Sequence, residues 1–142
     1  MTVVIDAGLV VATALPLPCS DEARSRIRLW TETGEVLLAP YLMAYEVATA
    51  CRKAVAASWL TADRAADALD DALSLNIHWV EPSPDLGRRA LAWAARIGQK
   101  AAYDAAYLAL AESAGVELWT TDRRLARAGR QAGVDWIRPV PE

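Results

Sequence analysis

Residues 2–6 read TVVID, a short β-branched run that stops at the acid Asp6. Such a run predicts a buried strand, because the strands of a parallel sheet are covered on both faces and are apolar throughout. An acid that directly follows a first buried strand is expected on the side of the sheet where α/β folds bind ligands. These five residues therefore predict an α/β fold with Asp6 at its ligand crevice.

Four further apolar runs predict strands, and helical patterns separate them. The expected strands cover residues 2–5, 36–39, 77–80, 117–120 and 134–138. The expected helices cover residues 21–33, 41–58, a stretch from 61, 83–98, 103–114 and 122–128. Because short strands alternate with helices, the sheet is expected to be parallel, doubly wound and covered by helices.

The length and composition indicate one globular domain over residues 1–142, since the chain has no repeat, linker or low-complexity segment. Hydrophobic residues make up 54% and charged residues 23%, which argues against disorder. No apolar run approaches the roughly 20 residues of a membrane span, and the N-terminus lacks the pattern of a signal peptide. A protein without a membrane segment, in the cytoplasm, is therefore expected.

Charge and cysteine usage exclude two further classes. A net charge of −3 excludes a uniformly basic coat for nucleic acid, although a local basic rim around an acidic site stays open. Cys19 and Cys51 have no metal-binding spacing, and one histidine leaves too few ligands for a structural zinc ion. Two reduced thiols in a cytoplasmic protein are expected.

Four carboxylates lie where the predicted sheet would bring them to one edge: Asp6, Glu46, Asp104 and Asp122. Each follows a predicted strand or lies near the start of a predicted helix. Taken singly, each has a simpler explanation, because Asp is a favoured helix N-cap and Glu46 suits a solvated helix surface. Only the combination points to a site, and spacing alone leaves the choice open.

Carboxylates gathered in one pocket require neutralisation. A pair of like charges at about 4 Å repels by about 4 kcal/mol at an effective dielectric of about 20. Oxygen ligands without a nearby histidine or cysteine favour Mg²⁺ or Mn²⁺ over zinc. Such an ion can lower the pKa of a bound water and hold a phosphate oxygen, which is the chemistry of phosphodiester hydrolysis.

Four sequence blocks carry a family resemblance: VVIDAGLVV at 3–11, PYLMAYEVATACRK at 40–53, YDAAYLALAESAG at 103–115 and LWTTDRRLA at 118–126. Together they resemble PIN-domain ribonucleases, and most of all the VapC toxins of bacterial and archaeal toxin–antitoxin pairs. The resemblance covers essentially the whole chain, with the blocks in the family's order.

The resemblance implies an α/β/α sandwich with a five-stranded parallel sheet and Mg²⁺- or Mn²⁺-dependent endonucleolytic cleavage of RNA. It assigns catalytic and metal-binding roles to Asp6, Glu46, Asp104 and Asp122. It also places the Thr120 hydroxyl beside the metal ligands. The family further implies a homodimer and a VapB-type antitoxin that blocks the site.

Two positions depart from the family pattern. Gly8 stands where the family often has Ser or Asn, and Thr49 stands where it often has Asn. Loss of groups that orient metal ligands can lower metal affinity by about 10- to 100-fold. The alternative function is therefore a PIN-like module that binds RNA or protein with weak or absent cleavage.

Four basic residues lie close in sequence to the acids. Arg52 and Lys53 lie about two turns beyond Glu46, and Arg123 and Arg124 directly follow Asp122. They are candidates for contacts to the RNA phosphate backbone, with ordinary solvated charge as the alternative.

Other features have structural explanations. The acidic stripe at Asp63, Asp67 and Asp71 lies opposite an alanine–leucine face (62, 65, 66, 69, 72 and 73), so a solvated surface is expected. His78 is expected to be packed or hydrogen-bonded within its strand, and the dispersed tryptophans are expected mainly in the core. No glycine-rich nucleotide-binding motif is present.

Overall fold

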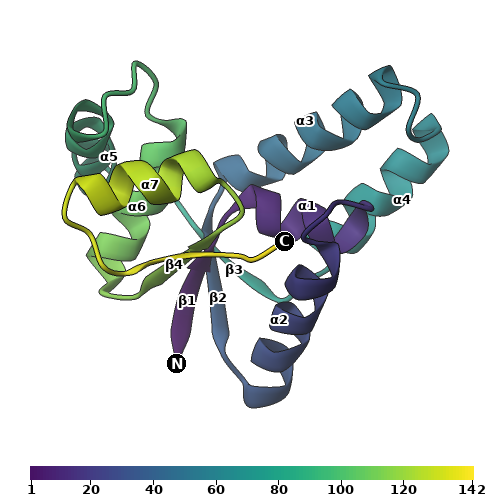
Figure 1. Ribbon diagram of the computed structural model, residues 1–142, viewed down its shortest axis with the longest axis horizontal. Helices are drawn as coiled ribbons and strands as arrows, with labels where there is room; N and C mark the ends of the chain where they lie inside the picture. Colours follow the sequence, from purple (N-terminus) through teal and green to yellow (C-terminus); the bar gives the residue numbers. More distant parts are fainter.

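Five parallel strands form one sheet in the computed structural model, which describes residues 1–142 (Figure 1). The strands are β1 (Thr2–Ile5), β2 (Val36–Pro40), β3 (Ile77–Val80), β4 (Glu117–Thr120) and β5 (Ile137–Pro139). Their spatial order is β3-β2-β1-β4-β5. Val3 of β1 is paired with Leu37 on one side and with Glu117 on the other. The predicted five-stranded parallel sheet is confirmed.

The strand order reverses at β1. The chain runs from β1 outward to β3 on one side and later returns to β4 and β5 on the other. Ligands of open α/β sheets bind at such a point, beyond the carboxyl ends of the strands. The end of β1, where Asp6 stands, is therefore the expected ligand position in the observed topology.

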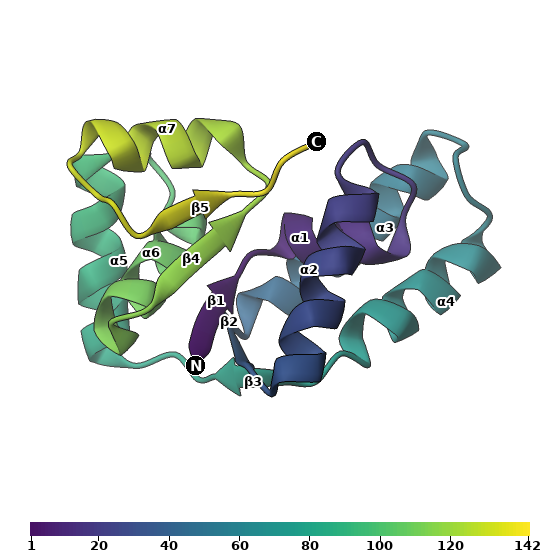
Figure 2. The same ribbon diagram turned by 60° about the horizontal axis from the view of Figure 1, so that its bottom comes forward.

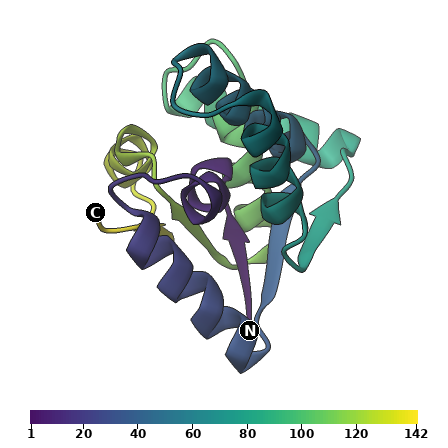
Figure 3. The same cartoon turned by 90° about the vertical axis from the view of Figure 1, so that its right-hand side faces the viewer.

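Seven helices surround the sheet in two groups (Figures 1 and 2). The helices are α1 (Ala7–Ala14), α2 (Ser20–Thr33), α3 (Leu42–Ala56), α4 (Ala62–Leu73), α5 (Pro84–Arg96), α6 (Tyr103–Ala114) and α7 (Arg123–Gln131). Helices α1–α4 pack together, with α3 and α4 paired as an arm, while α5 packs on α6 and α7 on β4 and β5. The C-terminus lies near the connection between α1 and α2 in all three ribbon views (Figure 3).

Helix α1 is an element that the sequence patterns did not predict. Its sequence AGLVVATA is apolar on all sides, so it lacks the one-sided period that marks a surface helix. The structure explains this composition, because five of its eight residues are buried against neighbouring elements. The Asp6 side chain starts the helix by accepting a hydrogen bond from the backbone N–H of Leu9 at 2.9 Å.

The start of β5 and the buried face of α4 differ from the expectation. Strand β5 starts at Ile137 rather than at 134, because the backbone N–H of Val134 donates to the Gly129 carbonyl at the end of α7. The buried face of α4 contains Ala68 as well as Ala65 and Ala72, whereas residues 62 and 66 are exposed. Alanine is small enough to suit either environment, so its positions define a helix face poorly.

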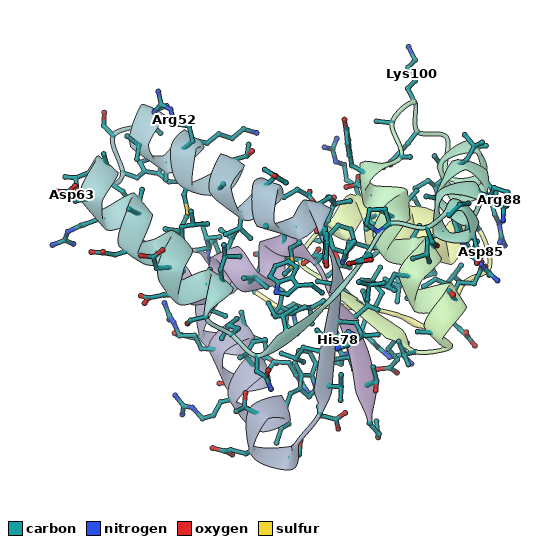
Figure 4. The ribbon with its side chains drawn as sticks, turned by 180° about the vertical axis from the view of Figure 1, so that it is seen from behind. Arg52, Asp63, His78, Asp85, Arg88 and Lys100 are labelled. Carbon is teal, nitrogen blue, oxygen red and sulfur yellow. The ribbon has the colours of Figure 1, made fainter.

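His78 was expected to be packed or hydrogen-bonded, and this prediction was wrong. Its side chain is exposed on β3 and forms no hydrogen bond (Figure 4). Strand β3 is the edge strand of the sheet, and alternate residues of such a strand can face solvent.

Several other expectations hold. Asp63, Asp67 and Asp71 are exposed on α4, and both cysteines are free thiols. Trp30 and Trp93 are buried, whereas Trp59 is 72% exposed beyond the end of α3. No helix combines the length and apolar character that crossing a bilayer would require.

Candidate active site

Asp6 is the most buried acid of the chain, with 7% of its surface exposed. Its backbone N–H donates to the Trp119 carbonyl at 3.2 Å, which holds the end of β1 against β4. Burial raises the pKa of Asp6 to about 6, and the nearby charge of Asp122 adds to this rise. The pKa of this carboxyl group is therefore close to neutral pH.

The Thr120 hydroxyl connects two of the candidate acids. It donates to Oδ2 of Asp6 at 2.5 Å and accepts a hydrogen bond from the backbone N–H of Asp122 at 2.9 Å. The side chain is fully buried at the end of β4. The donated hydrogen bond lowers the pKa of Asp6 and so favours its charged form. Thr120 thus fixes the geometry of Asp6 and the backbone of Asp122 together.

Asp122 is both a helix cap and a neighbour of Asp6. Its Oδ1 accepts hydrogen bonds from the backbone N–H groups of Arg124 and Leu125, at 2.9 and 3.1 Å, at the start of α7. The capping explanation considered for the sequence therefore holds for Asp122, as it does for Asp6. Capping uses only Oδ1 of Asp122. Its second oxygen has no hydrogen-bond donor from the protein and stays available for another role.

Glu46 and Asp104 face one another across a second part of the site. Glu46 lies in the second turn of α3, and its Oε1 accepts a hydrogen bond from the Tyr107 hydroxyl at 2.6 Å. Asp104 lies in the first turn of α6, and its Oδ2 accepts a hydrogen bond from the Gln99 amide at 3.0 Å. Partial burial raises the pKa of Glu46, and the charges of Asp104 and Asp6 add to the effect.

The four acids form a chain of electrostatic neighbours. The charge of Asp122 raises the pKa of Asp6, and the charges of Asp104 and Asp6 raise the pKa of Glu46. They come from four different elements and share the carboxyl edge of the sheet. No three histidine, cysteine, aspartate or glutamate side chains are grouped closely enough to hold one metal ion. Simultaneous coordination of one ion by three acids would therefore require side-chain rotation.

A cavity with a volume of about 850 Å³ lies beside Glu46 and Asp104. Glu46 and Asp104 line it from opposite walls. Of the four basic residues predicted to contact RNA, only Lys53 lines this cavity. Arg52 lies on the outer part of the α3 arm in Figure 4. Arg123 pairs with Glu142 at 3.4 Å, and Arg124 is exposed without an ion pair.

Sequence reasoning missed the two residues that orient Glu46 and Asp104. Tyr107 lies three residues after Asp104, so helical spacing could have placed it on the same face of α6. Its burial and the Glu46 charge raise its pKa, which keeps the hydroxyl protonated as a donor. Gln99 precedes α6 in an irregular segment, where no periodicity indicates the direction of its side chain.

The backbone at Gly8 passes close to the β4–α7 connection. A Cβ atom at position 8 would lie 2.0 Å from the Thr121 hydroxyl oxygen and 3.6 Å from Oδ1 of Asp6. Thr121 therefore occupies the volume that a side chain at position 8 would need. Its backbone N–H also donates to Oδ2 of Asp6 at 3.3 Å.

Comparison with known families identifies the fold. A family model described as the PIN domain matches residues 3–131. The chain belongs to the PIN domain family. All four candidate acids lie inside the matched range.

One curated protein and two solved structures resemble this chain over most of its length. The chain is 34% identical over 131 residues to Ribonuclease VapC3 of Pyrobaculum aerophilum, which covers 89% of this chain and 93% of that protein. A solved structure from the same organism, PAE2754, is 29% identical, with a TM-score of 0.63 and coverage of 90% and 87%. VapBC2 of Rickettsia felis, solved with a promoter DNA fragment, is 12% identical, with a TM-score of 0.71 and coverage of 99% and 100%. The last likeness concerns the fold alone.

The contact between Gly8 and Thr121 explains one departure from the PIN pattern. The Thr121 side chain fills the space that the Ser or Asn side chain expected from the family resemblance would occupy at position 8. We expect Gly8→Ala to destabilise the wild type by about 1–3 kcal/mol, because the added methyl group forces Thr121 to move. In a Thr121→Ala background the same change should cost less than in the wild type, because the overlap with the hydroxyl is gone and only the Cβ atom of residue 121 stays close, at 3.3 Å.

Urea unfolding of the two single variants and the double variant measures this coupling directly. Additive effects of the two substitutions would show that Gly8 and Thr121 do not compete for the same space.

Proposed function

We propose that this PIN domain is a divalent-metal-dependent endoribonuclease and the toxin of a VapBC-type pair. The observation that carries the proposal is the placement of four acids from four elements at the point where strand order reverses. The raised pKa values of Asp6 and Glu46 support the idea that these acids share one electrostatic environment. The likeness to Ribonuclease VapC3 over nearly the whole chain supports the ribonuclease assignment.

The donor set suits Mg²⁺ or Mn²⁺. Every candidate ligand is a carboxylate oxygen, which these hard cations prefer. Hydrogen bonds from the protein occupy only one oxygen of each of Glu46, Asp104 and Asp122, which leaves the other oxygen available. Asp6, Asp104 and Asp122 would hold the ion, with Glu46 as a direct or water-mediated ligand. When bound, the ion supplies an activated water and stabilises charge on the phosphate.

The residues of the chain position the reacting groups. Thr120 orients Asp6, Tyr107 orients Glu46 and Gln99 orients Asp104. The oriented carboxylates direct a water molecule at the phosphorus atom, in line with the leaving 3′ oxygen. Lys53, which lines the cavity beside Glu46 and Asp104, would contact a phosphate of the RNA, and Arg52, Arg123 and Arg124 would contact other phosphates of the backbone.

The partners form part of the same proposal. A VapB-type antitoxin that covers the acids would control the toxin, and the likeness to Ribonuclease VapC3 over nearly the whole chain supports this pairing. Homodimerisation and a cytoplasmic location complete the proposal. Light scattering of the purified chain measures the first. A small antitoxin gene just upstream would support the pairing independently of the structure.

A cleavage assay tests the proposed activity. End-labelled RNA incubated with the purified chain should give internal products with Mg²⁺ or Mn²⁺ and none with EDTA. Products that form equally in EDTA would overturn the metal requirement.

The alternative is a PIN-like module that binds RNA or protein with weak or absent cleavage. It is favoured by the spacing of the acids, which do not group three at a time. Binding without any product in the same assay would establish this alternative.

A further inference from the structure

Helix α7 is fixed against β5 by a close approach of its backbone. A Cβ atom at Gly129 would lie 2.1 Å from Cδ1 of Ile137, so the helix packs with its backbone directly on the Ile137 side chain. Leu125 and Ala126 are also buried on α7, within one turn of Gly129. The other side of the helix therefore faces away from the sheet and is held as a rigid surface.

That surface carries a row of three arginines, Arg123, Arg127 and Arg130. They have the i, i+4, i+7 spacing of one helix face, and the row extends over about 10 Å at about 1.5 Å per residue. All three side chains are exposed, and α7 contains no acid that could pair with them. Arg127 and Arg130 form no ion pair and no side-chain hydrogen bond. Two guanidinium groups of the row thus have no anion beside them.

The end of β5 and the residues after it form an apolar wall opposite the arginines. Pro139, Val140 and Pro141 run beside α7, and the backbone N–H of Val140 donates to the Thr120 carbonyl at 2.8 Å, which holds this segment in place (Figures 1 and 2). The space between the two walls has a volume of about 320 Å³, and Ala126 is its remaining lining residue. We call this space the arginine hollow. No carboxylate lines it.

One acid of the chain reaches an arginine of this hollow. Oε1 of Glu142 lies 3.4 Å from Nη2 of Arg123, and both side chains are largely exposed. An exposed pair of this kind contributes little to stability and is screened by salt. The pair shows that the hollow accepts an anion, and it is weak enough for a more highly charged anion to replace it.

We propose that the arginine hollow is a second ligand site of this protein and binds a nucleoside triphosphate. The guanidinium groups hold the phosphate oxygens, which arginine recognises with paired N–H donors. A chain of linked phosphates suits three neighbouring guanidinium groups better than a single carboxylate does. The apolar wall packs against the nucleoside, and the volume of the hollow lies in the range of about 300–1,000 Å³ that is typical of small-molecule sites.

The proposed site differs in chemistry from the acids at the carboxyl edge of the sheet. The acids need a cation before they can approach a phosphate, whereas the arginine hollow attracts phosphate without a metal ion. Binding in the hollow is therefore expected in EDTA and should weaken as salt rises. The inference goes beyond the proposed ribonuclease function and does not depend on it.

Calorimetric titration of ATP into the full chain in EDTA tests the site. Saturable binding is expected, and Arg127→Gln and Arg130→Gln should each weaken it about fivefold or more, because each removes a charged hydrogen-bond donor. Arg28→Gln is the matched control, since Arg28 is an exposed arginine on α2 without an ion pair, and it should leave ATP affinity unchanged. All three positions are exposed, so the variants are expected to fold as the wild type does.

Glu142→Gln should change ATP affinity in the opposite direction. It removes the anion that competes for Arg123, so ATP should bind about two- to threefold more tightly. An affinity at or below that of the wild type would contradict a site built from all three arginines.

Inorganic tripolyphosphate and a 12-nucleotide oligoadenylate separate the possible ligand classes in the same buffer. Tripolyphosphate should bind more weakly than ATP, because it has no nucleoside to pack against the apolar wall. The inference is overturned by absent ATP binding, by an equal loss in Arg28→Gln, or by tripolyphosphate that binds as tightly as ATP. It is also overturned if oligoadenylate binds more tightly than ATP with the same dependence on Arg127 and Arg130, which would make the hollow a nucleic-acid contact.

Discussion

Asp6→Asn is expected to abolish RNA cleavage and at the same time to stabilise the protein at neutral pH. The two effects have one cause, because the wild type holds a charge at a buried position. Burial raises the pKa of Asp6 from 3.8 to about 6, so the folded protein binds a proton more tightly than the unfolded chain does. A raised pKa in the folded state gives stability that is present at low pH and lost as pH rises through about 6.

The size of the gain follows from the same values. A rise from 3.8 to about 6 corresponds to at most about 3 kcal/mol at neutral pH. The NH2 group of the Asn amide donates and cannot accept, so an Asn with its nitrogen at the Oδ2 position loses the hydrogen bonds from Thr120 and Thr121, which offsets about 1 kcal/mol or more. A net stabilisation of about 1–2 kcal/mol is therefore expected at pH 7.5, and it should disappear near pH 4.

Urea unfolding in EDTA at both pH values measures this effect, and an RNA cleavage assay measures activity. Asp67→Asn, an exposed acid on α4, is the control and should change neither quantity. A destabilised Asp6→Asn at pH 7.5 would show that the Asp6 charge is compensated within the protein. Wild-type cleavage by this variant would remove Asp6 from the mechanism.

Thr120→Val is expected to lower cleavage strongly near neutral pH while keeping the shape of the side chain. The substitution removes the hydrogen bond that favours charged Asp6, so the pKa of Asp6 rises further above about 6. It also leaves the backbone N–H of Asp122 without its acceptor, which costs about 1–3 kcal/mol of stability. The acid limb of the cleavage profile should therefore move to higher pH.

Thr120→Ser keeps the hydroxyl and provides the matched comparison. It should retain the wild-type pH profile at some cost in packing, because Thr120 is fully buried. Equal pH profiles for the Val and Ser variants would mean that Thr120 acts through packing alone.

The fold was largely predictable because buried parallel strands have a plain sequence pattern. The run before Asp6 is apolar and β-branched, and the structure places it as the central strand. Helix α1 was not predicted, because a helix buried on all sides has no polar face that would reveal the helical period. His78 was misjudged because an apolar strand pattern does not show whether the strand lies at an edge.

The candidate site was predictable only in part. Asp6 directly follows β1 and Asp122 comes two residues after β4, so topology alone brings them to one edge. The partners that orient the acids depend on side-chain directions across distant elements, as for Tyr107 on α6 and Glu46 on α3. The close approach of Thr121 to Gly8 likewise joins the β4–α7 connection to the start of α1, which the sequence separates by more than a hundred residues.

Calorimetric titration of Mn²⁺ into the purified protein at pH 7.5 tests the shared role of the four acids most directly. Saturable binding is expected for the wild type and for Asp67→Asn. Asp6→Asn, Asp104→Asn and Asp122→Asn should each lose most of this heat, and Glu46→Gln should weaken it. Wild-type Mn²⁺ affinity in all four acid variants would contradict the proposal that these carboxylates form one cation-binding site.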